Sequence, residues 1–400
     1  MSVAYICDAV RTPIGRFGGA LSGIRSDDLA AIPLIALKKR NKDIDWDAVD
    51  DVILGCANQA GEDNRNIARM AVLLANYGTV VPGTTVNRLC ASGMDSIIMA
   101  ARSIISKDAH MIIAGGVESM TRAPFVLPKS EYAFSRKTEI YDTSMGWRFV
   151  NPKLEAAHGA EAMPQTAENV AEQFNINRED QDLFAKNSQD RAEIAIKSGR
   201  FVKEIVPVSI PRRKQVDFVF DTDEHPRNSS FEVLQTLKPI VKQGGTVTAG
   251  NSSGINDGAA ALIIASEAAV KRHHLTPRAR FVASAVVGVP PRIMGIGPGP
   301  ATQKVLAKMR YNIGDMDVIE INEAFASQSL ATLRMLGLRD NTPHVNPNGG
   351  AIALGHPLGM SGTRIVMTAI EELHETGGHK ALATMCIGVG QGIASIFERV

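Results

Sequence analysis

The chain has 400 residues, and at about 100–200 residues per domain this length predicts two or three domains. Its 44% hydrophobic and 21% charged residues are typical of a globular protein and exclude wholesale disorder. Lys plus Arg number 43 against 42 for Asp plus Glu, and this balance argues against a nucleic-acid partner or a membrane surface.

The chain ends and the apolar runs bear on location. No apolar run reaches the roughly 18–20 residues that span a bilayer, so we expect no membrane partner. The first residues lack a basic stretch followed by an apolar one, and the last three match no retention or peroxisomal address. We therefore expect no secretory signal, and the sparse cysteines described below favour a reducing cytoplasm.

Short apolar runs alternate with helical patterns in the N-terminal part. Strands are expected at 3–6, 52–54, 84–87 and 111–114, and helices at 26–37, 67–74 and 92–105. Ser26 is expected to cap the first helix. Strands separated by helices of this length favour a parallel sheet that is covered on both faces.

Residues from about 120 to 245 differ in character, with basic, acidic and Pro-punctuated stretches and a helical pattern at 166–173. We interpret them as a large insertion that forms a lid or loop domain, since long insertions in α/β folds usually carry binding function. The alternative is an insertion with a purely structural role.

The C-terminal part repeats the N-terminal pattern. Strands are expected at 318–321, 382–385 and 393–397, and helices at 324–336 and 363–373. Val86 and Asn87 match Val345 and Asn346, and the Ser-Gly pair at 92–93 matches the pair at 361–362. This faint duplication favours two related α/β halves.

The chain has four cysteines, Cys7, Cys56, Cys90 and Cys386. None has the spacing of a zinc knuckle, and four are too few for a disulfide scaffold, so we expect reduced thiols and no metal site. Cys7 and Cys56 lie in or beside apolar runs and are interpreted as core filler.

Cys90 lies at the junction between an expected strand and an expected helix. A helix N-terminus favours a thiolate over a thiol, and this edge of an α/β sheet is where ligands bind. Cys386 follows an apolar strand and begins a Gly-rich turn, where a thiol could exchange a proton with a carbon acid. For each cysteine an inert, structural thiol is the alternative.

His356 lies in a Gly-rich loop that could present its imidazole to a neighbouring thiol. An ordinary loop histidine is the alternative. Asn322 follows an expected strand and either caps the next helix or holds a water that donates to an oxyanion. The small residues of 246–260 allow a ligand to approach closely, and a tight sheet turn is the alternative reading.

These segments, in this order, resemble the thiolase family over essentially the whole chain. The motifs that carry the resemblance are NRLCASG at 87–93, GGVESM at 115–120, NEAF at 322–325, GHPLG at 355–359 and CIGVGQG at 386–392. The resemblance implies two similar α/β halves packed as a layered core, with an inserted loop domain. The first half would be 1–120 completed by about 246–270, the insertion 121–245, and the second half 271–400.

The resemblance also implies roles for single residues. Cys90 would be the nucleophile that is acylated, and Cys386 the acid/base. His356 would activate Cys90 and share one oxyanion hole with a water held by Asn322, while the backbone N–H groups of Cys90 and Gly388 would form a second. Small-molecule acyl-CoA substrates, coenzyme A as co-substrate, no permanently bound cofactor, ping-pong kinetics and a homotetramer are implied as well.

The resemblance places five residues at the coenzyme A and acyl sites: Ser253 at the pantetheine, Met163 at the thioester pocket, Arg227 at the nucleotide end, and Ala324 and Phe325 along the tunnel wall. In one departure, Ala162 stands where some acetoacetyl-CoA thiolases have a histidine, which argues against a short acetoacetyl substrate.

Four stretches are similar to 3-oxoadipyl-CoA thiolases of aromatic catabolism: RFGGAL at 16–21, GEDNRN at 61–66, GWRF at 146–149 and AMPQT at 162–166. Such a substrate ends in a carboxylate, which suits the planar fork of an arginine, and we take Arg148 or Arg136 as the partner. A solvated surface arginine is the alternative for each. The alternative activity is a general 3-ketoacyl-CoA or acetoacetyl-CoA thiolase of fatty-acid metabolism.

Three other classes of protein fit the sequence less well. A decarboxylating ketoacyl synthase lacks the second cysteine, so Cys386 argues against it. A non-catalytic coenzyme A or lipid carrier would not need Cys90, Asn322, His356 and Cys386 together. Nothing indicates the peptide cleft of a cysteine protease.

Overall fold

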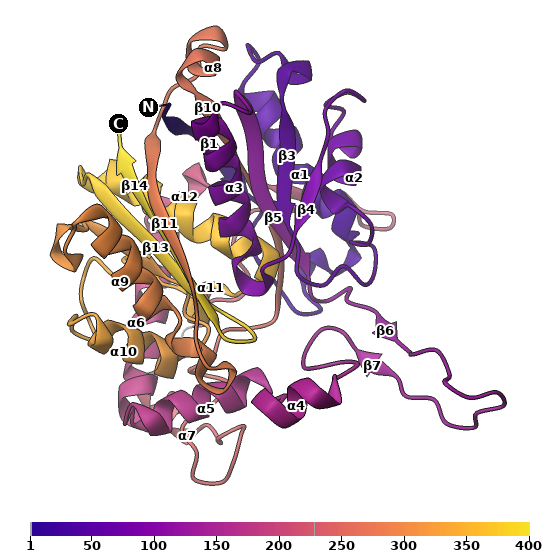
Figure 1. The fold of residues 1–400 in the computed structure, drawn as a ribbon, viewed down its shortest axis with the longest axis vertical. Helices are drawn as coiled ribbons and strands as arrows, with labels where there is room; N and C mark the ends of the chain where they lie inside the picture. The colour runs from indigo at the N-terminus through magenta and orange to yellow at the C-terminus, as the bar shows by residue number, and fades with distance from the viewer. Residues whose placement is uncertain (1, 228) are drawn as a thin grey trace.

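The computed structural model describes residues 2–227 and 229–400 (Figure 1). Its main feature is a large sheet in the order β12-β13-β14-β11-β1-β10-β5-β3-β4, with β2 beside β10. The strands of the N-terminal side are β1 (Ala4–Arg11), β2 (Gly15–Arg16), β3 (Asp51–Gly55), β4 (Thr84–Val86), β5 (Met111–Ser119) and β10 (Asn256–Ser266). Those of the C-terminal side are β11 (Ala279–Gly288), β12 (Val318–Ile321), β13 (Lys380–Ile387) and β14 (Gln391–Arg399).

The two sides of the sheet have the same topology. The order β3-β5-β10-β1 on one side corresponds to β12-β13-β14-β11 on the other, and β1 joins β11 in the middle. Val345 bridges to Ile319 of β12, in the place that β4 takes beside β3. The expected pair of similar halves is therefore confirmed.

The expectation of a parallel sheet is wrong in part. β3 pairs in parallel with β4 and β5, and β12 with β13, but the remaining pairs of the large sheet are antiparallel. The reason lies in the connections. β13 and β14 are joined by a tight hairpin, which only antiparallel strands allow. β10 enters after a long insertion rather than after a single crossover helix.

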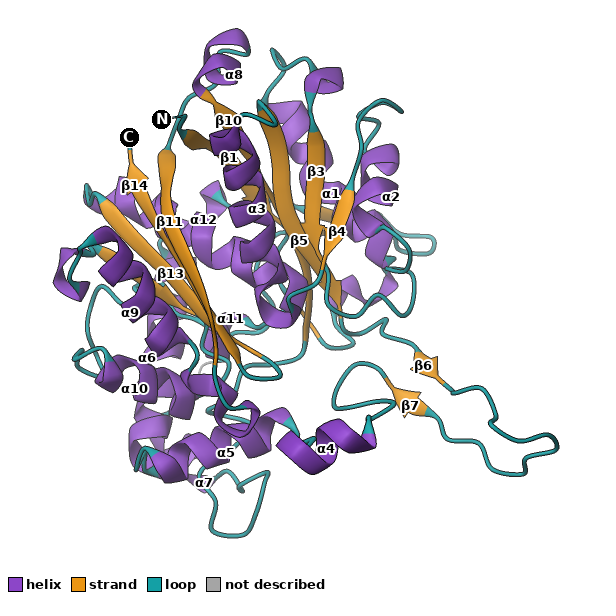
Figure 2. Cartoon of the chain, viewed as in Figure 1, coloured by secondary structure: helices purple, strands orange, loops and turns teal. Residues whose placement is uncertain are grey.

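Helices separate and cover the two halves, as Figure 2 shows. The helices around the sheet are α1 (Ser26–Arg40), α2 (Ile67–Leu74), α3 (Ser92–Ser106), α8 (Glu267–Arg272), α9 (Pro298–Met309), α10 (Ala326–Met335), α11 (Ala351–Leu354) and α12 (Leu358–Thr376). One core lies between α1, α2 and the first half. A second surrounds α3 and α12 between the halves, and a third lies between the second half and α9, α10. The layered core is therefore confirmed.

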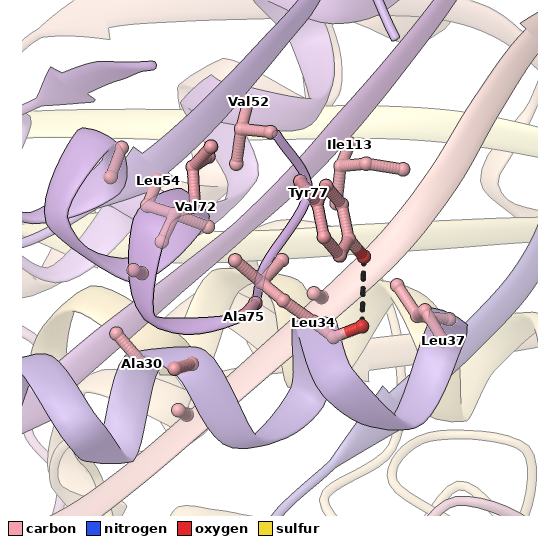
Figure 3. Close-up of a cluster of buried hydrophobic side chains, with 14 of the residues drawn as sticks. Ala30, Leu34, Leu37, Val52, Leu54, Val72, Ala75, Tyr77 and Ile113 are labelled. Carbon is pink, nitrogen blue, oxygen red and sulfur yellow. Dashed lines mark hydrogen bonds between the residues drawn. The ribbon is translucent and has the colours of Figure 1, made fainter. Parts of the chain in front are cut away.

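The core under α1 and α2 illustrates how these layers are held (Figure 3). Leu34 and Leu37 of α1 face Val52 of β3 and Ile113 of β5, so apolar side chains from one helix and two strands share one interior. Tyr77 is 1% exposed, and its hydroxyl donates to the Leu34 carbonyl at 2.8 Å. The buried phenol therefore keeps a hydrogen-bond partner.

The segment between β5 and β10 contributes no strand to the large sheet among its described residues. It contains β6 (Phe125–Val126), β7 (Tyr141–Asp142), α4 (Pro152–His158), α5 (Met163–Gln173), α6 (Arg178–Lys197), β8 (Val208–Ile210), β9 (Phe218–Phe220) and α7 (Phe231–Thr236). Buried Arg11 of β1 bonds both carboxylate oxygens of Asp223 in this segment, at 2.7 and 2.9 Å. A bidentate buried pair of this kind fixes the segment to the sheet.

Several local expectations need correction. Ser26 begins α1 but does not cap it, because the N-cap position is Arg25. The sequence patterns predict no strand at β10 or β11. The start of β10 lies in the small-residue segment 246–260, for which we expect close approach of a ligand or a tight turn, yet every residue of β10 is buried, since the strand lies between β1 and β5.

One apolar stretch is longer than expected. Leu89–Ser106 has the length and hydropathy that a membrane-spanning helix needs, and 61% of it is buried inside the protein. A buried core helix such as α3 meets the same criteria, so this stretch is weak evidence for a membrane segment.

Glycines let the two halves approach closely at the centre. A Cβ on Gly93 of α3 would lie 2.5 Å from the Gly359 carbonyl O, and one on Gly116 of β5 would overlap the same carbonyl. Gly362 of α12 lies in turn against Met94 of α3. The backbone of α12 is therefore seated directly on α3 and β5.

Gly116→Ala is expected to lower stability by about 1–3 kcal/mol, because the added methyl would meet backbone that cannot rotate away. The midpoint of thermal unfolding measures this loss. Gly314→Ala is the matched control, since no atom lies within 4 Å of a Cβ there, and we expect a change within about 0.5 kcal/mol. Equal midpoints for the two variants would contradict the close packing.

Candidate functional site

Cys90 lies in a strained turn between β4 and α3. The turn is a short 3-10 helix, Leu89–Ala91, and Leu89 has a φ of 47°. The Asn87 side chain accepts from the Leu89 N–H at 2.8 Å, and the Ser92 hydroxyl accepts from the Arg88 N–H at 2.9 Å. A non-glycine residue at positive φ beside a thiol is typical of a functional site.

The surroundings of Cys90 oppose ionisation. Burial raises the pKa of its thiol to about 11, although the backbone N–H groups of Cys90 and Gly388 act in the opposite direction. The backbone N–H groups therefore act on Cys90 in the expected direction, but they do not decide the state of the resting thiol. Cys90 lies just before α3, as expected, and the loss of water outweighs the two N–H donors.

We expect the alkylation of Cys90 by iodoacetamide to accelerate about tenfold per pH unit between pH 7 and 10, because only the thiolate reacts. Peptide mass spectrometry at each pH gives the rate at this residue alone. A plateau below pH 8 would contradict a neutral resting thiol. The buried Cys7 and Cys56 are internal controls that should react far more slowly.

His356 is held in one orientation by the loop before α12. Its Nδ1 lies 2.6 Å from the Ser361 hydroxyl, which itself donates to the Pro357 carbonyl at 2.8 Å. Nδ1 therefore carries the hydrogen, and the lone pair of Nε2 is left to accept one. Nε2 lies 3.4 Å from Asn322 Nδ2. Burial, with Arg364 nearby, lowers the pKa of His356 to about 3, so the ring is neutral near pH 7.

Cys386 lies at the end of β13 and is completely buried. Its Sγ is 3.2 Å from the side-chain amide of Gln328 in α10. Burial and the nearby Cys90 thiol raise the pKa of Cys386 well above its usual range. A Cβ on Gly388 would lie 3.1 Å from the Leu89 side chain, so the hairpin after Cys386 touches the Cys90 turn.

Glu118 joins the loops of the two halves beneath these groups. Its carboxylate accepts from the N–H groups of Ala57 and Asn58 at 3.0 Å, and from that of Gly359 at 2.8 Å. Burial raises its pKa to about 7. With Cys56 and Asp63 it forms a cluster of possible metal ligands within 4.8 Å of one another. Three backbone N–H groups already donate to its oxygens. The geometry therefore favours a hydrogen-bonded link between the loops over a metal site.

The structure brings together four of the five residues expected at the acyl and coenzyme A sites. Met163, Ala324 and Phe325 pack in one cluster with Cys386 and Met294. The Ser253 N–H donates to the Ala324 carbonyl at 2.9 Å, which places this serine beside the cluster. Arg227 is exposed, and its N–H donates to Gln189 Oε1 at 2.9 Å, so no described contact joins it to the others.

Sequence reasoning gave no role to three residues that the geometry makes prominent, Ser361, Glu118 and Gln328. Glu118 lies in the motif at 115–120 and Ser361 in the Ser-Gly pair at 361–362, but the sequence does not show their hydrogen-bond partners. Gln328 had a weak signal, since it lies in a polar Ser-Gln-Ser run within a helix that should be apolar on its buried side.

The chain is similar to known proteins over its whole length. It matches the family Thiolase, N-terminal domain, over residues 4–268 and Thiolase, C-terminal domain, over residues 275–399. A beta-ketoadipyl-CoA thiolase of Acinetobacter baylyi is 61% identical over 401 residues, covering 100% of both chains. A 3-oxoadipyl-CoA/3-oxo-5,6-dehydrosuberyl-CoA thiolase of Escherichia coli is 60% identical with the same coverage. A crystal structure of human mitochondrial 3-ketoacyl-CoA thiolase in complex with CoA has a TM-score of 0.91 and 40% identity, covering 100% of this chain and 98% of that one.

Proposed function

The chain belongs to the thiolase family, and from this premise we propose that it cleaves 3-oxoadipyl-CoA with coenzyme A to succinyl-CoA and acetyl-CoA. The names of its full-length relatives support this substrate and a place in the breakdown of aromatic compounds. The observation that carries the chemistry is the meeting of the Cys90 turn with the Cys386 hairpin. Asn322, which lies 3.4 Å from His356, is linked to Cys386 because Gln328 contacts both.

The first half of the reaction acylates Cys90. As its sulfur attacks the C3 carbonyl carbon, the thiol proton passes to Nε2 of the neutral His356. The bond between C2 and C3 then breaks, and its electron pair leaves with C2 as the enolate of acetyl-CoA. Cys386 gives its proton to C2, so acetyl-CoA departs and a succinyl group remains on Cys90.

The second half releases the acyl group to coenzyme A. The Cys386 thiolate takes the proton of the incoming thiol, whose sulfur attacks the succinyl carbonyl. The bond to Cys90 breaks, and the leaving sulfur regains its proton from His356. Two oxyanion holes serve these steps: the N–H groups of Cys90 and Gly388 form one, and His356 with a water on Asn322 the other.

Steady-state kinetics test this function. We expect parallel lines in double-reciprocal plots with varied coenzyme A, because a covalent intermediate separates the two half-reactions. We also expect kcat/KM to be higher for 3-oxoadipyl-CoA than for acetoacetyl-CoA. The reverse preference would instead support a general 3-ketoacyl-CoA or acetoacetyl-CoA thiolase.

Arg148 is our candidate partner for the distal carboxylate of the substrate. Its half-buried guanidinium lies 3.5 Å from the backbone and side-chain oxygens of Asn58, its only side-chain hydrogen bonds among the described residues. Asn58 follows Ala57, whose carbonyl accepts from the Asn87 side chain at 2.9 Å in the Cys90 turn. This chain of contacts links Arg148 to the turn, and no carboxylate of residues 2–227 or 229–400 pairs with its charge.

Arg148→Met is expected to lower kcat/KM about 10–100-fold for 3-oxoadipyl-CoA and to leave acetoacetyl-CoA nearly unchanged, because only the first substrate has a carboxylate. Arg136→Met is the matched control. Arg136 is exposed in the segment that projects between β6 and β7 (Figure 1). Equal losses on both substrates would remove Arg148 from this role.

Organisation and location complete the proposal. We assign 1–120 with about 246–270 to the first half, 121–245 to an inserted loop domain and 271–400 to the second half. We further propose a homotetramer of two dimers in the cytoplasm that acts on acyl-CoA substrates without a permanently bound cofactor. The four free cysteines support a reducing compartment, and the family resemblance supports the tetramer.

A further inference from the structure

Gln328 connects two groups to which the proposed function gives roles. It lies in the first turn of α10 and has no exposed surface. One end of its amide is 3.2 Å from Cys386 Sγ and 3.1 Å from the Asn322 carbonyl O. The other end is 2.7 Å from the Ser329 backbone N. A single side chain therefore contacts the acid/base sulfur and the backbone of Asn322.

The neighbours of the amide decide which end faces the sulfur. The Asn322 carbonyl can only accept a hydrogen bond, and the Ser329 N–H can only donate one. The amide nitrogen of Gln328 therefore faces Asn322 and Cys386, while its oxygen accepts from Ser329. One N–H of the nitrogen bonds the Asn322 carbonyl, and the second is available to the sulfur.

The sulfur of Cys386 needs such a donor for part of each turnover. After Cys386 has given its proton to C2, a thiolate remains at a position with no exposed surface. An unpaired charge in such a place is costly, and a hydrogen bond to a charged group is stronger than one between neutral groups. Cys90 is the one titratable group, among the described residues, whose charge shifts Cys386.

We propose that Gln328 is a positioning residue that donates an N–H to the Cys386 thiolate and holds it against the Asn322 segment. The proposal rests on the acid/base role of Cys386 in the proposed function. It does not depend on which acyl chain the enzyme prefers, because the amide acts on the sulfur.

The test measures the exchange of acetyl-CoA methyl protons with D2O, which requires a base at C2. Gln328→Met retains the length of the side chain and removes the N–H. We expect exchange to slow about 10–100-fold, the usual value of a hydrogen bond to a charged group. The alkylation of Cys90 should not change, since it does not use Cys386. Gln181→Met, at another fully buried glutamine, is the matched control and should exchange normally.

Gln328→Glu gives a pH dependence that a packing defect would not produce. A protonated carboxyl group has one O–H, which the Asn322 carbonyl and the thiolate compete for, and the charged thiolate is the stronger acceptor. A carboxylate has no donor and repels the thiolate. Exchange by this variant should therefore fall as pH rises through the titration of the new carboxyl group. Exchange by the wild-type enzyme should rise over the same range, as more thiolate forms.

Unchanged exchange in Gln328→Met would overturn the proposal, as would equal losses of exchange and of Cys90 alkylation. If Gln328→Met does not fold, Gln328→Glu decides, and exchange that rises with pH in that variant overturns the proposal. If the wild-type enzyme shows no exchange, the acid/base role of Cys386 in the proposed function is wrong, and the role proposed for Gln328 fails for that reason.

Discussion

Cys90→Ala is expected to reduce thiolysis at least about 10⁴-fold, because the acyl group has no other place to reside between the half-reactions. Intact-protein mass spectrometry after addition of 3-oxoadipyl-CoA without coenzyme A should show an added succinyl group on the wild-type chain. The Cys90→Ala chain should show none. The position of the modification is read from the peptide that contains residue 90.

Cys7→Ala is the matched control, since Cys7 is a buried thiol of β1 in the core under α1 and α2. We expect it to retain both turnover and the added mass. Continued turnover in Cys90→Ala with an intact fold would remove the covalent mechanism altogether. An acyl group on another cysteine of the wild-type chain would show that this other cysteine is the nucleophile.

His356→Ala is expected to lower kcat/KM about 10²–10⁴-fold, the usual contribution of a general base. The neutral imidazole receives the thiol proton, and without it the Cys90 thiol, whose pKa is raised to about 11, must ionise unaided. Stopped-flow measurement of the first turnover separates this loss from substrate binding, which should change little.

The pH profile gives an independent check on His356. Its pKa is lowered to about 3, so the ring stays neutral above pH 5 and should not produce a decline in kcat/KM between pH 6 and 7. His158→Ala, at the exposed end of α4, is the control and should retain full activity. Full activity in His356→Ala would contradict the assignment.

Much of the fold could be predicted from local patterns. The expected helix 67–74 and strand 318–321 coincide with α2 and β12, because each is a compact apolar run with polar residues at its ends. β10 was missed because it is buried on both faces. Its run of small and apolar residues lacks the alternation of a half-exposed strand.

The site could be located from motifs but not described from them. His356 and Cys386 could be located because glycines surround them, and Cys90 because it lies between an expected strand and an expected helix. Their catalytic roles stay predictions. The raised pKa of Cys90 could not be read from the sequence, since it results from burial by distant segments. The contact between Gln328 and Cys386 joins residues 58 positions apart, and no local pattern reports it.

The pairing of β1 has a consequence for synthesis on the ribosome. In the described part of the chain, β1 pairs with β10 and β11, which begin at Asn256 and Ala279, and its last residue, Arg11, also bridges Ile205. The first strand to emerge therefore waits, unpaired and apolar, until more than half of the polypeptide has been translated. The nascent chain must keep that strand from aggregating throughout this interval. The large sheet can be completed only late in synthesis, because its strand pairs join residues far apart in the sequence.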